Sequence, residues 1–173
     1  MADDIELVDY DPNWPSQFAA EAAFLRAALG QDLIAAIDHF GSTAVPGLAA
    51  KPIIDILLTT TDLAGARARF PDVLKTHGYV FWRDDPNPER LYLVKGLAPF
   101  GPKRTHHLHV VPAQSPMRAQ ISFARHLAAN PDIARAYGAL KAELAERYRT
   151  DREAYTEGKT AFISAIMAQI KTD

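Results

Sequence analysis

The chain has 173 residues, 19 basic and 21 acidic side chains, a net charge of -2 and no cysteine. A chain of this length can bury about 70% of the surface that its unfolded form exposes, so we expect one domain without disulfides or thiolate metal sites. The balanced charge creates no overall field toward a phosphate backbone, and we expect no nucleic-acid partner. No apolar run approaches the roughly 20 residues of a membrane span, and the acidic start is unlike a signal peptide. We therefore expect a cytoplasmic protein with no membrane partner.

The first third of the chain is predicted to hold one helix and two strands. Asn13 can cap a helix that Gly30 ends. Residues 33–40 form a short apolar run that is typical of a strand, and residues 41–50 form a loop of small residues. Residues 53–58 are aliphatic apart from Asp55, which predicts a buried strand carrying one acid.

The middle of the chain is predicted to return to a helix and then to strands. Asp62 can cap a helix that ends at Gly78, and Pro71 predicts a break in it near Phe70. The expected strands cover residues 79–82, 90–95 and 105–111, the first two joined as a hairpin.

The last third changes to helical periodicity from Pro116 onward. Two helices are expected on either side of Asn130-Pro131, and residues 150–153 fit a capping box that opens a last helix. The order of elements predicts an α+β fold, with a mixed β-sheet, helices on one face and C-terminal helices packed over the other. We expect residues 1–173 to form one domain, with an α/β core in 1–112 and helices in 113–173.

Polar side chains occupy the same phase on three of the predicted strands. Alternate residues of a strand share a face, and the side chains opposite in phase to the aliphatic ones are Asp55, Arg90, Tyr92, His107 and His109. One interpretation is the solvent face of a one-sided sheet. However, an acid among aliphatic neighbours needs a partner, which favours a binding site for a cation or a phosphate ligand.

Four stretches of the sequence resemble the GrpB family, an uncharacterised family of the nucleotidyltransferase-fold superfamily. They are VDYDPNWP at residues 8–15, GSTAVPGLAAKPIIDI at 41–56, HLHVV at 107–111 and the segment 155–162. The resemblance implies that the Gly41-Ser42 turn holds nucleotide phosphates while acids on nearby strands hold divalent cations, Mg or Mn. This chain has Leu57 in place of the second acid and offers His109 in place of the third.

The resemblance assigns expected roles to particular residues. Asp55 and His109 are the candidate catalytic residues. We expect the C-terminal helices to cover the face of the sheet that carries them. The candidate phosphate or nucleotide ligands are Gly41, Ser42, Lys51, Arg90, Tyr155 and Lys159. The expected partner is a small nucleotide or CoA-like ligand, since relatives fused to dephospho-CoA kinase are known, and the expected reaction is nucleotidyl transfer to a small acceptor. One carboxylate together with substrate phosphates can hold magnesium. The missing acids therefore affect the expected nucleotide binding less than the expected two-metal catalysis.

Two other functions remain open on the sequence. Asp55, His107 and His109 form a two-histidine, one-carboxylate set that suits a single zinc, iron or nickel ion. A non-catalytic interaction module could instead use the loop at residues 82–88, which we expect to be exposed.

Overall fold

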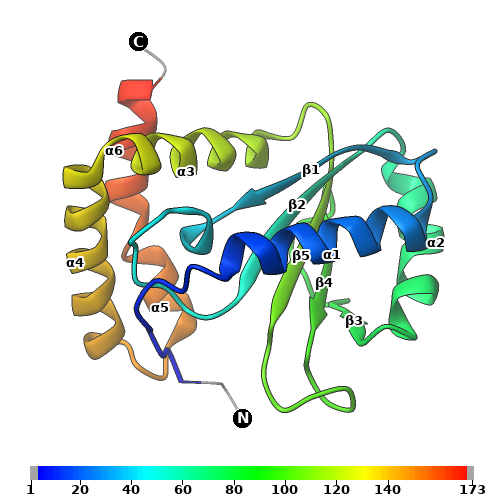
Figure 1. The fold of residues 1–173 in the computed structure, drawn as a ribbon, viewed down its shortest axis with the longest axis horizontal. Coiled ribbons are helices and arrows are strands. Elements are labelled where there is room, and N and C mark those ends of the chain that lie inside the picture. The colour runs from blue at the N-terminus through cyan, green and yellow to red at the C-terminus, as the bar shows by residue number, and fades with distance from the viewer. Residues whose placement is uncertain (1–3, 171–173) are drawn as a thin grey trace.

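A five-stranded mixed sheet forms the centre of the computed structural model, which describes residues 4–170 (Figure 1). The strands are β1 (Ile34–Phe40), β2 (Ile54–Thr60), β3 (Tyr79–Phe81), β4 (Leu91–Lys95) and β5 (His106–Pro112). Their order across the sheet is β1-β2-β5-β4-β3. β2 and β5 run parallel, and the other neighbouring strands run antiparallel. The mixed sheet predicted from the sequence is confirmed.

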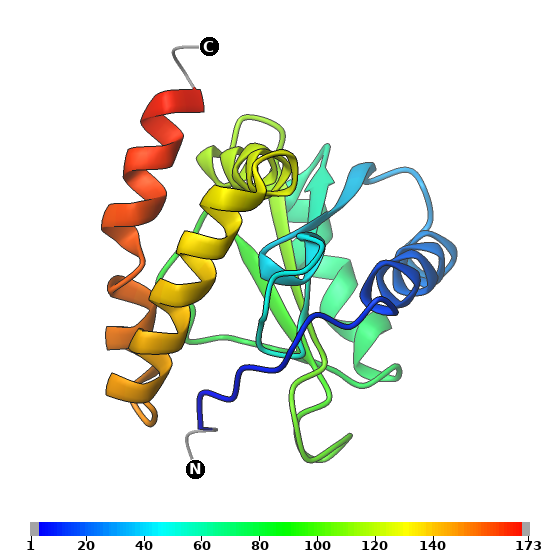
Figure 2. The ribbon, with the colours of Figure 1, turned by 60° about the vertical axis from the view of Figure 1, so that its left-hand side comes forward.

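Helices lie on both sides of this sheet. They are α1 (Trp14–Leu29), α2 (Leu63–Lys75), α3 (Ala119–Ala129), α4 (Pro131–Arg147), α5 (Arg152–Glu157) and α6 (Thr160–Ile170). Figure 2 shows α1 and α2 on one side of the sheet and the C-terminal helices on the other, as the sequence predicted. Across residues 4–170, none of the helices has the length and apolar character needed to span a membrane.

Because alternate side chains of a strand point to opposite faces, the apolar side chains of the sheet form one cluster on each face. The larger cluster joins α1 and α2 to one face of β2, β4 and β5 through residues such as Ile56, Leu93 and Leu108. A smaller cluster on the opposite face includes Leu57 and Ile121. The side chains of Asp55, His107 and His109 belong to this opposite face, because they alternate with the members of the larger cluster.

The predicted break near Phe70 is wrong, since α2 continues through Pro71 to Lys75. A proline inside a helix removes one hydrogen bond and crowds the preceding turn. Ala66, Phe70 and Leu74 are nevertheless fully buried along one side of α2. Tertiary packing of this stripe therefore outweighs the local cost of the proline.

The predicted last helix is divided into α5 and α6, and its cap is one residue later than expected. Asp151 rather than Thr150 is the N-cap, with its carboxylate accepting a hydrogen bond from the Ala154 amide at 3.0 Å. A side chain at Gly158 would place its Cβ 2.6 Å from Leu144 Cδ2. Gly158 therefore packs closely on Leu144 of α4, and a larger residue there would displace the leucine side chain.

A buried ion pair ties α1 to the far edge of the sheet. Glu21 on α1 accepts hydrogen bonds from Lys95 Nζ at 2.7 and 2.8 Å and from the Tyr79 hydroxyl at 2.9 Å. Burial raises the pKa of Tyr79 well above its ordinary value, and the charge of Glu21 acts in the same direction. The hydroxyl therefore stays protonated and donates to the carboxylate.

Removing Lys95 should destabilise the fold because it leaves the Glu21 carboxylate buried without its counter-charge. We expect Lys95→Met to lower the free energy of unfolding by about 3 kcal/mol in urea denaturation. Lys75, an exposed lysine at the end of α2, provides the control, and Lys75→Met should change stability by less than about 0.5 kcal/mol. Equal effects of the two substitutions would contradict a structural role for the pair.

Candidate functional site

A cavity of about 690 Å³ lies where the second face of the sheet meets the C-terminal helices, and we call it the central cavity. Every residue that the sequence suggested for the site lines it: Gly41, Ser42, Lys51, Asp55, Arg90, Tyr92, His107, His109, Tyr155 and Lys159. The strands contribute the acid, the histidines and Tyr92, while α5 and the start of α6 contribute the last part of the lining. The structure thus brings together residues that are far apart in the sequence.

The turn after β1 places its backbone directly against the Asp55 carboxylate. β1 ends at Phe40, whose Cα partner on β2 is Asp55. Gly41 follows with φ 72°, a conformation that L side chains rarely adopt, and Ser42–Ala44 form a short 3₁₀ turn. A Cβ at Gly41 would lie 2.5 Å from Asp55 Oδ2. Glycine is required here both by the backbone and by the neighbouring carboxylate.

Asp55 and His107 are paired side by side on the parallel strands β2 and β5. His107 Nδ1 and Asp55 Oδ1 are 2.9 Å apart. Burial acts to raise the pKa of Asp55, but the hydrogen bond and charge of His107, with a contribution from Lys51, outweigh it and lower that pKa. An ionised carboxylate can only accept, so Nδ1 carries the proton. The other ring nitrogen, Nε2 of His107, is buried, and among the described residues no hydrogen-bond partner reaches it.

Arg90 fixes the protonation of His109, whose Nδ1 accepts a hydrogen bond, whereas Nδ1 of His107 donates one. Arg90 Nη1 lies 3.2 Å from His109 Nδ1, and an arginine can only donate, so Nδ1 accepts. Burial lowers the pKa of His109 to about 3, so the ring is neutral with its proton on Nε2. Arg90 is fixed in turn by two hydrogen bonds to Asp85, at 2.8 and 2.6 Å, and its guanidinium lies over the Tyr92 ring.

Leu57 is sealed in the core rather than exposed to the central cavity. Its Cα partner on β5 is His109, and its side chain is fully buried with Phe40, Val111 and Ile121. Where the resemblance places acids beside Asp55, this chain therefore has a packed leucine and a neutral histidine bonded to Arg90.

Positive side chains gather around the Tyr155 ring. Lys159 Nζ lies 4.2 Å and Lys51 Nζ 5.4 Å from the centre of that ring. Burial lowers the pKa of Lys159 to about 8, helped by the charge of Lys51 and opposed by that of Asp55. Burial also lowers the pKa of Lys51, with repulsion from Arg152 and Arg104 adding to it. The cavity therefore concentrates positive charge in a partly dry environment.

Sequence reasoning missed several residues of the lining, among them Arg104, Tyr137, Lys141 and Arg152. Lys141 is only 2% exposed, and its Nζ donates to the Ala49 carbonyl. Burial lowers its pKa to about 7, and the charges of Lys159 and Lys51 act in the same direction. The available signal was its position, because Lys141 falls in the apolar stripe of α4 between Tyr137 and Leu144. Six cationic side chains line the cavity (Lys51, Arg90, Arg104, Lys141, Arg152 and Lys159), and among the described lining residues Asp55 is the single acid.

The loop at residues 82–88 is exposed at five of its seven residues, as expected, and the exceptions are Trp82 and Asp85. Trp82 is half-buried, with the Arg104 guanidinium 5.1 Å from the centre of its ring. Asp85 is engaged by Arg90, and the Arg67 guanidinium donates to the Pro88 and Arg90 carbonyls. The loop therefore helps to position Arg90 without lining the central cavity itself.

Comparison with known sequences assigns the chain to a family. The GrpB protein family matches residues 4–169. The UPF0157 protein PA4798 of Pseudomonas aeruginosa is 48% identical over 167 residues, which cover 96% of this chain and 68% of that protein. A dephospho-CoA kinase of Mycolicibacterium paratuberculosis is 31% identical over 90% of this chain, but the match covers only 43% of that larger protein.

Comparison with solved structures supports the same assignment and the expected fold. The crystal structure of GrpB from Enterococcus faecalis superposes with a TM-score of 0.83 at 33% identity, covering 95% of this chain and 96% of that one. Cid1, solved in complex with the UTP analogue UMPNPP, superposes with a TM-score of 0.54 at 16% identity, covering 87% of this chain and 48% of that one. The fold is nucleotidyltransferase-like, and the chain belongs to the GrpB family.

Proposed function

We propose that the central cavity binds a nucleotide or CoA-like ligand through its phosphates, together with one divalent cation, and that it supports nucleotidyl transfer to a small acceptor. The observation that carries this proposal is the ionised carboxylate of Asp55 against the Gly41-Ser42 turn, in a cavity otherwise lined by cations. The cavity volume, about 690 Å³, lies within the range of about 300–1,000 Å³ that small-molecule sites occupy.

The phosphate position follows from the turn itself. Gly41 allows a ligand to approach the backbone, and Ser42 offers both an amide and a hydroxyl. Lys51 and Lys159 supply compensating charge from the other side of the cavity. A phosphate on this turn would, however, also lie beside the negative Asp55 carboxylate, so the arrangement favours an anion that arrives with its own cation.

Asp55 fits a role as the ligand of that cation. His107 occupies Oδ1, and Oδ2 faces the Gly41 turn. Magnesium and manganese prefer oxygen ligands, and magnesium is held by one or two carboxylates together with substrate phosphates. A divalent cation bound there would neutralise phosphate charge. Leu57 and His109 add no carboxylate, and Arg90 supplies positive charge at that position instead, which favours one cation over two.

The ligand class is supported by the relatives. The rings of Tyr92, Tyr137 and Tyr155 line the cavity but are already packed against other side chains, so they do not identify a base. One relative is a dephospho-CoA kinase, and the Cid1 structure holds a UTP analogue. Thermal-shift measurements with ATP, UTP, CoA and dephospho-CoA, each with magnesium, with manganese and without metal, should therefore show stabilisation by one of these ligands that depends on the metal.

Asp55→Asn should remove the metal dependence of binding. We expect the affinity for the magnesium complex of the ligand selected in the panel to fall by about 10- to 100-fold in calorimetry, as for a lost contact at a metal site. The fold should lose some stability, because the lowered pKa of Asp55 indicates that the folded chain favours the ionised carboxylate, and asparagine removes that charge. Asp38→Asn on β1 is the matched control, since Asp38 lies outside the cavity lining. Unchanged binding by Asp55→Asn would exclude Asp55 from the site.

Gly41→Ala should reduce binding through a clash that a second glycine does not share. Gly41 and Gly47 have similar φ values, 72° and 75°, but a Cβ at Gly47 would meet no atom within 4 Å. Both alanine variants should lose about 1 kcal/mol or more of stability from the strained backbone. Only Gly41→Ala should also weaken nucleotide binding in calorimetry, because it displaces the Asp55 carboxylate. Equal binding by the two variants would show that the turn is not part of the site.

A single transition-metal site is the second candidate, and one observation favours it. Asp55, His107 and His109 each offer a ligand atom, and these atoms lie within 4.8 Å of one another. The hydrogen bond at His109 opposes it, because Arg90 donates to Nδ1 and leaves the proton on Nε2. The Asp55–His107 hydrogen bond does not oppose it, since it leaves Nε2 of His107 available. Elemental analysis of the purified protein should therefore find zinc, iron and nickel well below one ion per chain. Stoichiometric retention of any of them after dialysis would favour the transition-metal site instead.

A further inference from the structure

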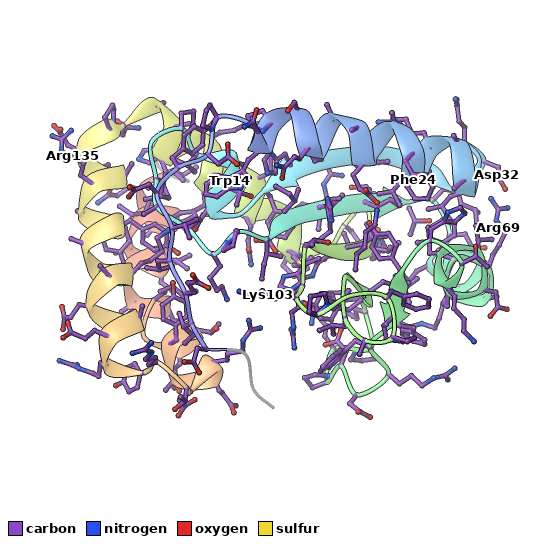
Figure 3. All side chains as sticks on the ribbon, turned by 60° about the horizontal axis from the view of Figure 1, so that its bottom comes forward. Trp14, Phe24, Asp32, Arg69, Lys103 and Arg135 are labelled. Carbon is purple, nitrogen blue, oxygen red and sulfur yellow. The ribbon has the colours of Figure 1, made fainter. Side chains whose placement is uncertain are left out.

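A second cavity, of about 280 Å³, adjoins the central cavity at the edge of the sheet where β2 and β5 begin. Its walls come from the N-terminal segment, the residues before β2, the loop before β5 and the start of α5. It is lined by Asp4, Glu6, Lys51, Pro52, Ile53, Pro102, Lys103, Arg104 and Arg152. Figure 3 shows Lys103 between the C-terminal helices and the strands.

The two cavities share part of their walls. Lys51, Ile53, Arg104 and Arg152 line both of them. Ile53 precedes Asp55 by two residues, a separation of about 6.6 Å along an extended chain. A molecule in the second cavity would therefore lie beside the Asp55 end of the central cavity.

Charge at the shared wall favours an anion in the second cavity. Four cationic side chains line it against two acids, and both acids are already engaged. Glu6 pairs with Lys103 at 3.6 Å, and Asp4 pairs with Arg149 at 3.5 Å. Burial is the main cause of the lowered Lys51 pKa, and repulsion from Arg152 and Arg104 adds to it. A bound anion would relieve that repulsion.

We propose that the second cavity is the subsite for the acceptor, and that it holds an anionic group of that acceptor, a phosphate or a carboxylate, against Lys103 and the shared wall of Lys51, Arg104 and Arg152. The role as acceptor subsite rests on the proposed function of the central cavity. In the reaction, an acceptor hydroxyl oxygen forms a bond to the α-phosphorus of a nucleoside triphosphate. The bond from that phosphorus to the bridging oxygen of the β-phosphate breaks, pyrophosphate leaves with the electron pair, and the hydroxyl proton passes to solvent.

Backbone amide NMR of the labelled full chain can observe the two cavities separately. Of these two cavities, Gly41 and Ser42 line the central one and not the second, whereas Glu6 and Lys103 line the second one and not the central one. The protein is first saturated with a non-hydrolysable ATP analogue and magnesium, which should shift the amides of Gly41 and Ser42. Inorganic phosphate or, in a parallel arm, acetate is then added. We expect saturable shifts of the Glu6 and Lys103 amides with one of these anions.

Charge reversal at Lys103 provides the decisive comparison. Lys103→Glu should weaken binding of the anion at the Glu6 amide by about tenfold or more, and should leave the nucleotide response of Gly41 and Ser42 unchanged. Lys75→Glu makes the same charge change on α2, outside the lining of both cavities, and should leave both responses unchanged.

Each outcome bears on one proposal separately. A response to phosphate alone or to acetate alone assigns the chemical class of the acceptor group. Absence of any saturable response at Glu6 and Lys103, or an equal response in Lys103→Glu, overturns the second subsite. If Gly41 and Ser42 do not respond to the nucleotide, the function proposed for the central cavity fails. The anion titration of the nucleotide-free protein then still decides whether the second cavity binds anions.

Discussion

The candidate site depends on the placement of one carboxylate between two strands and a glycine turn. Asp55 belongs to a strand whose other side chains are almost all buried, so the carboxylate must be satisfied on the single face that the helices of the first half leave uncovered. The parallel pairing of β2 with β5 provides His107 as its immediate neighbour. The antiparallel pairing with β1 brings Gly41 against the other oxygen. The position of each neighbour is thus fixed by sheet register rather than by a flexible loop.

The arrangement of charge around Asp55 differs from a site built on several acids. Leu57 stands where the resemblance places a second acid, and its side chain is packed in the core. His109 stands where it places a third acid, and it is neutral and accepts a hydrogen bond from Arg90. Positive charge is instead distributed over six side chains around the cavity. Such a lining favours anionic ligands and offers few ligand atoms for metal ions. It agrees with the proposed ligand, whose phosphates would complete the coordination of one metal ion.

Strand periodicity made much of the site predictable from the sequence. Because alternate side chains share a face, the phase of Asp55, His107 and His109 was enough to place them together, and the apolar stripes of α3 and α4 located the roof. Local signals failed at two places: Pro71 remains within α2, where packing outweighs its cost, and the last helix is divided between α5 and α6. Arg104 and Arg152 were missed because a cation in a loop or at the start of a helix has no sequence signal for the cavity it enters. For Lys141 the one signal was its position in the apolar stripe of α4.

The Tyr155 ring that lies near both Lys51 and Lys159 has a consequence for how the cavity receives a ligand. Lysines are commonly kept in place by carboxylates, and an incoming anion must then compete with that acid. An aromatic face attracts an ammonium group through its quadrupole and carries no net charge. The two lysines are thus held beside a ring rather than by a directly paired carboxylate, although the charge of Asp55 acts on both. A phosphate of the proposed ligand could therefore pair with them while the ring contacts persist.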